Sequence, residues 1–215
     1  MNRLRRFLAP SVRLLLVLFG VVGLLAIPGP APAAADPFGW EPGAPNLLAD
    51  SLDHWYCTPA IAESNRTHYN SAMAHLDAAT DLYDVNSGDS CGSSTDVAFI
   101  ETDLNGPLGR AQCVSAVPNT LLCDSAWVLV DNAEHWSTAA YCGSSAAELT
   151  GNFIITTRHE LGHTVGLSHT PPIAPTCGGA ILGNDPMTSD WVRNQPLSIF
   201  NYNLHHIGHV NNFYN

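Results

Sequence analysis

The residues most able to do chemistry lie together in one short stretch, RHELGHTVGLSHT, from Arg158 to Thr170. His159 and His163 are four residues apart, so on a helix their imidazoles lie on one face, one turn apart, and can bind one metal ion. Glu160 is rotated by about 100° from His159 on such a helix, which places its carboxylate beside the metal without ligating it. A carboxylate in that position can hold and deprotonate a metal-bound water.

A third protein ligand is needed, because catalytic zinc usually has three protein ligands and one water. His169 can be that ligand only if the chain turns back after the helix. Gly166 permits the reversal, since glycine adopts the left-handed conformation that ends many helices. The stretch therefore predicts three zinc ligands, His159, His163 and His169. Glu160 is then the catalytic base, and the alternative is a helix with ordinary buried histidines.

These ligands require a helix that ends near Gly166, and the preceding sequence predicts one at about 145–165. Ser145 can cap its first turn, and Glu148 is placed to complete a capping box with that serine. Apolar residues recur at helical spacing along the range, which gives the helix a face to bury.

Other elements must support this helix. A helix is expected from Thr58 to Tyr83, because threonine caps helices and the proline that follows fits the first turn. Two apolar runs, Asp96–Glu101 and Ala126–Asp131, predict strands, and the second is expected to be buried. Ala111–Val117 alternates in the manner of an exposed edge strand.

Two further groups of residues could bind metal ions. Asp84, Asn86 and Asp89 offer oxygen ligands for calcium, although their spacing does not match the calcium loop that ends in a distant glutamate. His205 and His209 are four residues apart and could chelate a second metal on a final helix. A solvated helix face is the commoner explanation for such a pair.

The N-terminal segment is typical of a secretory signal peptide. Four arginines precede or begin an apolar run, Leu14–Ile27, that is short for a bilayer span of about 20 residues. Small residues follow, so residues 1–35 are expected to be removed by cleavage after Ala35. The mature protein is then extracellular and has no membrane anchor. We expect residues 36–52 to form an extended arm and residues 53–215 to form the folded domain.

The expected mature chain is strongly acidic. It holds four arginines and 19 acidic residues, a formal charge of −15, and the sequence contains no lysine. Such a surface repels phosphate backbones, which argues against nucleic-acid binding, and its acidity favours solubility instead. We expect the protein to be a monomer.

All six cysteines lie after the signal segment, and an even number in an exported chain favours disulfides. None forms a C-x-x-C pair, which argues against a cysteine zinc site. Fifteen pairings are open in principle. We expect these three: Cys57 with Cys91, Cys113 with Cys123, and Cys142 with Cys177.

The segment His159–His169 resembles the zinc-binding pattern of metzincin metalloproteases, H-E-x-x-H-x-x-G-x-x-H, and matches it at every fixed position. Metzincins also carry a methionine turn downstream, for which Met187 in Asp185–Thr188 is the candidate. Leu108–Val114 is similar to the family's edge strand, which pairs with peptide substrate. Trp127–Trp136 is similar to the strand and loop that follow it.

The resemblance implies an α+β fold of the metzincin (zincin) type. A twisted mixed β-sheet with long helices would form the N-terminal portion, and zinc would bind in a cleft. A small C-terminal subdomain, about 167–215, would hold the methionine turn and a final helix, about 197–211. Some metzincins place a tyrosine that assists at zinc two residues after the methionine. Ser189 stands there in this chain, which leaves Tyr202 as the candidate for an oxyanion or substrate contact.

The implied function is a secreted zinc-dependent endopeptidase that hydrolyses peptide bonds of protein or peptide substrates, with one catalytic zinc. The alternative from another class is a catalytically silent metal-binding or adhesion module that retains the fold. A zinc hydrolase of non-peptide amides is a third hypothesis, against which the edge strand argues. Glu160 distinguishes the peptidase from the silent module, because a silent module is free to lose its catalytic base and this chain keeps it.

Overall fold

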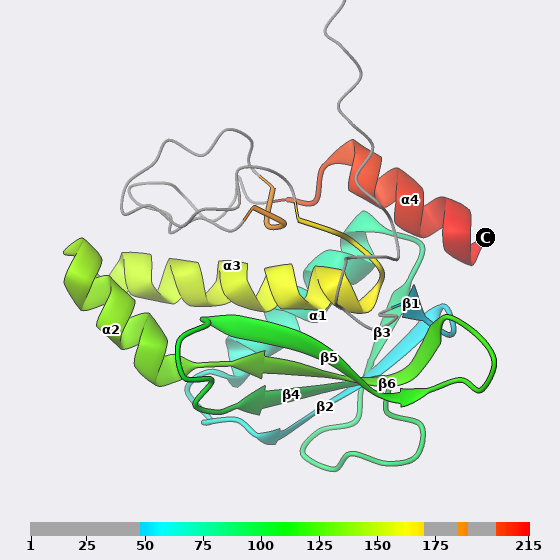
Figure 1. The fold of residues 1–215 in the computed structure, drawn as a ribbon, viewed down its shortest axis with the longest axis horizontal. Coiled ribbons are helices and arrows are strands. Elements are labelled where there is room, and N and C mark those ends of the chain that lie inside the picture. Colours follow the sequence, from blue (N-terminus) through cyan, green and yellow to red (C-terminus); the bar gives the residue numbers. More distant parts are fainter. Residues whose placement is uncertain (1–47, 170–184, 189–200) are drawn as a thin grey trace, which may run out of the picture. The chain divides into compact units, whose positions relative to one another are not determined.

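The computed structural model describes residues 48–169, 185–188 and 201–215, and all of them belong to the compact unit Ala34–Asn215. Among the described elements, the six strands and helix α1 come first, and the last three elements are helices (Figure 1). In chain order the elements are β1 (Leu48–Ala49), β2 (Asp53–Ala60), α1 (Arg66–Ala79), β3 (Tyr83–Asn86), β4 (Val97–Glu101), β5 (Gly109–Ala116), β6 (Leu122–Val130), α2 (Asn132–Cys142), α3 (Ala146–Thr164) and α4 (Leu204–Tyr214).

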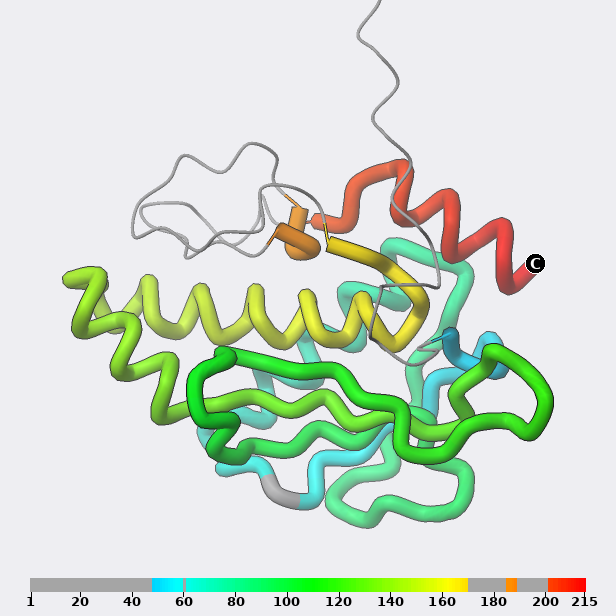
Figure 2. Tube along the Cα trace, in the orientation of Figure 1, coloured from blue at the N-terminus to red at the C-terminus, as the bar shows by residue number. Residues whose placement is uncertain are grey.

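The described strands form one mostly parallel sheet in the order β1-β6-β4-β2-β3, and β5, which is not on this path, also pairs with β6. Strands β2, β3, β4 and β6 run parallel, so α1 serves as the crossover from β2 to β3. Strand β5 is antiparallel to β6, with Gly109 opposite Val130, and forms an edge of the sheet (Figure 2). The mixed sheet expected from the sequence is therefore present in an α+β fold.

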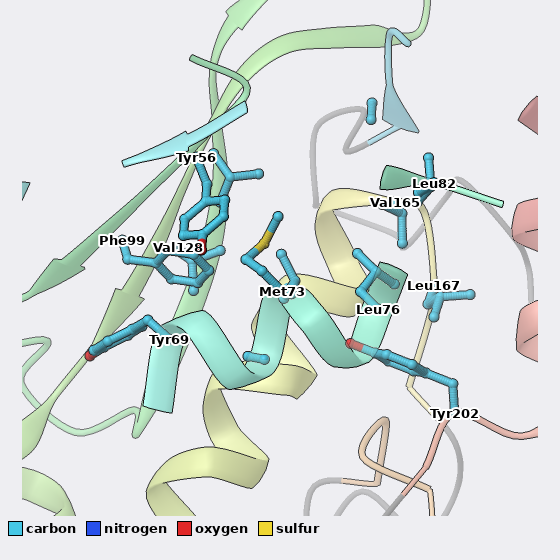
Figure 3. Close-up of a cluster of buried hydrophobic side chains, with 14 of the residues drawn as sticks. Tyr56, Tyr69, Met73, Leu76, Leu82, Phe99, Val128, Val165, Leu167 and Tyr202 are labelled. Carbon is cyan, nitrogen blue, oxygen red and sulfur yellow. The ribbon is translucent and has the colours of Figure 1, made fainter. Parts of the chain in front are cut away.

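The main hydrophobic core lies between the sheet, α1 and α3. Tyr69 of α1 joins the three, because its ring lies 5.0 Å from that of Phe99 on β4 and 5.5 Å from that of Phe153 on α3. Met73 and Leu76, on the same face of α1, are also fully buried (Figure 3). This packing fixes α3 against the sheet, and α3 carries the histidine-rich segment.

The helix predicted from Thr58 to Tyr83 was wrong at both ends. Thr58 lies in β2, and the helix begins only at Arg66 and ends at Ala79. Strand β2 pairs with β3 on one side and β4 on the other, so its backbone is satisfied by the sheet. The local signal for a helix start was therefore overridden by pairing with distant segments. Strand β3 begins at Tyr83, the last residue of the predicted helix.

The three predicted strands were confirmed with shifted ends, as β4, β5 and β6. The loop expected after β6 was wrong, because helix α2 begins at Asn132. The side chain of Asp131 caps this helix by accepting a hydrogen bond of 2.9 Å from the backbone N–H of Glu134. The final helix, expected at about 197–211, begins at Leu204, where Asn203 caps it. Residues 197–200 lie outside the described residues.

Two of the expected disulfides are present, Cys57–Cys91 and Cys113–Cys123. The first ties β2 to the loop before β4, and the second joins the paired strands β5 and β6. Cys142 is also disulfide-bonded, and its expected partner, Cys177, lies outside the described residues. Within the described ranges, no helix has the length and hydropathy needed to cross a bilayer.

The expected signal peptide, residues 1–35, lies outside the described residues, as do residues 36–47 of the expected arm. The arm's described part includes β1, which adds to the sheet by parallel pairing of Leu48 with Leu122. Leu48 also forms an isolated antiparallel bridge with Val165, just after α3. The first described strand therefore contacts the chain just after the helix that carries the histidines.

Candidate metal centre

Helix α3 has the start and the end that the sequence predicts. At its start, the Ser145 hydroxyl accepts from the N–H of Glu148, and the Glu148 carboxylate accepts from the N–H of Ser145, which completes the capping box. At its end, Gly166 has φ of 85°, in the left-handed region. The N–H of Gly166 donates to the carbonyl of His163, and the N–H of Leu167 donates to that of Gly162, the two bonds of a Schellman motif.

The reversal at Gly166 brings the third histidine back to the other two. The Nε2 atom of His163 lies 3.1 Å from Nε2 of His159 and 3.2 Å from Nε2 of His169. Ligand atoms of the three residues all lie within 4.8 Å of one another. Nitrogens bound at about 2.0–2.1 Å to one tetrahedral zinc are roughly 3.3 Å apart, so the spacing suits a shared ion.

The hydrogen bonds on the far side of two rings fix their tautomers. Nδ1 of His159 lies 2.8 Å from the carbonyl oxygen of Pro186, and Nδ1 of His163 lies 2.7 Å from that of Leu167. A carbonyl oxygen can only accept, so each Nδ1 carries the proton. In the neutral rings, each Nε2 then presents a lone pair, and two lone pairs at 3.1 Å repel unless a cation lies between them. The residues present therefore fit a metal ion.

Burial reinforces this preference for neutral imidazoles. His159 is 7% exposed and His163 is 9% exposed. Burial lowers the pKa of His159 well below its usual value, and the neighbouring His163 and His169 lower that pKa further when they are charged. A buried histidine that stays neutral at pH 7 is in the form that binds metal.

Glu160 is buried on α3 and faces the start of β5. A Cβ atom at Gly109 would lie 2.6 Å from Cγ and 2.7 Å from Oε1 of Glu160, so only glycine fits there. It would also lie 2.7 Å from Cγ2 of Thr156, one turn earlier on α3. The side chain of Thr156 is hydrogen-bonded to His135 of α2. Nδ1 of His135 donates to the carbonyl of Asp131, so its Nε2 is unprotonated in the neutral ring and accepts from the Thr156 hydroxyl at 3.0 Å. Burial lowers the pKa of His135, which favours this neutral ring.

Met187, the candidate for the methionine turn, lies in a turn and is fully buried against α3. A Cβ atom at Gly162 would collide with the Met187 sulfur and would lie 3.1 Å from Cε1 of Tyr202. Glycine at this position of the motif thus allows close packing beneath the histidines. The turn itself is closed by Asp185, whose Oδ1 accepts from the N–H of Met187 at 2.9 Å and whose carbonyl accepts from Thr188.

Asp185 also joins this turn to α4, a role that the sequence did not predict. Its Oδ2 accepts from the side-chain amide of Asn203 and lies 2.9 Å from Nδ1 of His206. His206 is 1% exposed, so this contact is buried. Pro186 was missed as well, although its carbonyl holds His159. The methionine-turn candidate includes both residues, but it did not predict these contacts, because each is made with a distant segment.

Tyr202 has a different role from the one expected. Its hydroxyl donates to the backbone carbonyl of Arg158 at 2.7 Å, and its ring stacks on that of His75 with a centroid separation of 5.5 Å. Burial raises the pKa of Tyr202, which keeps the hydroxyl a donor. These contacts give the side chain a packing role beneath α3 in place of the expected oxyanion or substrate contact. Ser189 lies outside the described residues.

The three candidate calcium ligands, Asp84, Asn86 and Asp89, have separate partners. The side-chain amide of Asn86 donates to Asn70 at 3.2 Å, and Asp89 forms an ion pair with Arg66. Asp84 lies in β3, which pairs with β2. These contacts give the calcium hypothesis no support.

No family model matches the chain, and no curated protein matches it.

Proposed function

We propose that this protein is a secreted zinc-dependent endopeptidase of the metzincin type. One observation carries the proposal: the Nε2 lone pairs of His159, His163 and His169 converge, while carbonyl groups hold the Nδ1 protons of the first two. Three imidazoles and an open fourth position are the usual protein contribution to catalytic zinc.

The donor set favours zinc over the alternatives. Calcium and magnesium prefer oxygen ligands, whereas imidazole suits zinc, copper, nickel and iron. Structural zinc sites usually have four protein ligands, and the described part of the chain brings only three together here. A fourth position for water or substrate favours catalysis over a purely structural role.

A zinc ion held by His159, His163 and His169 would supply Lewis-acid chemistry, which lowers the pKa of a bound water toward about 7. Glu160 accepts the proton of that water and then passes it to the leaving amine. Its burial on α3 shields the carboxylate from bulk water, and the lack of a side chain at Gly109 leaves room for it. His159 and His163 stay oriented through the carbonyls of Pro186 and Leu167.

The edge strand supports a peptide substrate. Among the strands that the structure describes, β5 pairs with β6 alone, so its other backbone edge can pair with an extended peptide. Gly109, at the start of this strand, lies against Glu160, so a peptide on β5 would pass close to the proposed base. The disulfides and the basic, apolar N-terminal segment support secretion.

The test is cleavage of a mixed peptide library by the purified protein, read by mass spectrometry with and without a chelator, together with metal analysis. We expect about one tightly bound zinc per chain and chelator-sensitive cleavage. Glu160→Gln should abolish cleavage while zinc stays bound, because the base is not a ligand. His163→Ala should lose both. Zinc binding without any peptide cleavage in the unmodified protein would favour the silent module instead, and absence of zinc would refute the peptidase.

A further inference from the structure

Helix α4 carries a second pair of histidines that the proposed function does not use. His205 and His209 lie one turn apart, and their Nε2 atoms are 3.0 Å apart. Their rings are nearly perpendicular, at 86°, with centroids 4.3 Å apart, so the two rings are not stacked. The nitrogens approach each other as closely as those of the three-histidine centre, where the separations are 3.1 and 3.2 Å.

This spacing suits two ligands of one ion. With metal–nitrogen distances of about 2.0–2.1 Å, nitrogens 3.0 Å apart subtend roughly 95° at the metal. That angle lies between the right angle of square-planar or octahedral coordination and the wider angle of tetrahedral coordination, so copper, nickel and zinc can each be accommodated. A single hydrogen bond between the two rings is the competing explanation. On an exposed helix face, water competes for such a bond, and its net worth is only about 0.5–1.5 kcal/mol.

The rest of α4 leaves the pair available to solvent. His206 and Val210 are buried and hold the inner face of the helix, and His206 contacts Asp185. His205 is exposed on the outer face, and His209 is partly exposed. The C-terminal end of the helix is tied down by the Asn211 side chain, which accepts from the N–H of Asp81 at 2.9 Å. The backbone that presents the two imidazoles is therefore fixed before any ion binds.

We infer that His205 and His209 chelate a divalent transition-metal ion of the zinc, nickel and copper class through their Nε2 atoms. The remaining coordination positions are filled by water or by a ligand from another molecule. With two protein ligands, this α4 site binds more weakly than the three-histidine centre. The inference does not depend on the proposed peptidase activity.

The experiment is a calorimetric titration of the metal-free protein with zinc chloride at pH about 7.5, where histidine is mostly neutral. Unmodified protein should bind two zinc ions, one tightly and one weakly. The double variant His205→Ala, His209→Ala should lose only the weak one, and His163→Ala should lose only the tight one. Asn212→Ala, an exposed change on the same helix, should keep both. Alanine favours helix, so circular dichroism should show that the α4 variants stay folded.

A double variant that binds as many zinc ions as the unmodified protein would overturn the α4 site. The two proposals fail separately. If His163→Ala has no effect while the double variant loses an ion, the α4 site stands and the catalytic centre falls. If only His163→Ala loses an ion, the catalytic centre stands and the close approach of His205 and His209 is a hydrogen bond.

Discussion

Replacing Gly109 with alanine should damage catalysis without disturbing the metal. Gly109 needs to be glycine for space and not for backbone conformation, because its φ is not in the left-handed region. The added Cβ would lie 2.6 Å from Cγ of Glu160, whereas ordinary contacts at a Cβ are 3.4–4 Å. The carboxylate must therefore move by roughly 1 Å, and a misplacement of that size costs about 100-fold in rate.

The measurement is kcat/KM on a peptide cleaved by the unmodified protein, together with the zinc content of each variant. We expect Gly109→Ala to lower kcat/KM about 100-fold, equivalent to about 2.7 kcal/mol, and to keep its zinc. Gly92→Ala is the matched control, because a Cβ there has no neighbour within 4 Å and the activity should not change.

Two results would refute the reasoning. Cleavage by Gly109→Ala at the unmodified rate would mean that the position of Glu160 is not critical. Loss of zinc together with activity would mean that the substitution acts through the three histidines and not through the base.

Three further predictions concern stability and metal binding. Gly166→Ala places a Cβ on a residue with φ of 85°, so it should lower the free energy of unfolding by about 1–2 kcal/mol in urea unfolding. It should also weaken zinc binding, as measured by titration. Unchanged zinc affinity would contradict the role of the chain reversal at Gly166. Met187→Ala removes a fully buried side chain beneath Gly162 and should cost about 2–5 kcal/mol in urea unfolding. His54 is 1% exposed, its ring nitrogens have no hydrogen-bond partner among the described residues, and burial lowers its pKa to about 4. Between pH 4 and 6.5 the ring is neutral in the folded state but protonated in the unfolded state, so stability is complete above pH 6.5 and falls as the pH drops toward 4, by up to about 3 kcal/mol. His54→Phe should flatten this part of the stability–pH curve, and an unchanged slope would contradict the assignment.

The sequence predicted best what depends on neighbours along the chain. The capping box of Ser145 and Glu148, the helix that follows and the reversal at Gly166 were all confirmed. Each is a backbone hydrogen-bond pattern completed within a few residues, so local residue types suffice to specify it. The same holds for the placement of His159 and His163 on one helix face, which follows from helical geometry alone.

Local signals failed where pairing between distant segments decided the outcome. Thr58 looked like a helix cap, but its strand lies between β3 and β4, and that pairing prevailed. The segment after β6 looked like a loop, but Asp131 caps a helix there. The sequence allowed Tyr202 to contact the metal site, but in the structure its hydroxyl donates to the backbone carbonyl of Arg158, 44 residues earlier.

By itself, the sequence determined a helix that presents two imidazoles and a carboxylate at fixed angles, followed by a turn that can return a third imidazole. Only the tertiary structure decided what surrounds them. Pro186 orients His159 across 27 residues, and Gly109 of an edge strand leaves room for Glu160. These contacts depend on how the strands pair and how α3 packs on the sheet. Such arrangements are set by the whole core, which no short stretch of sequence specifies.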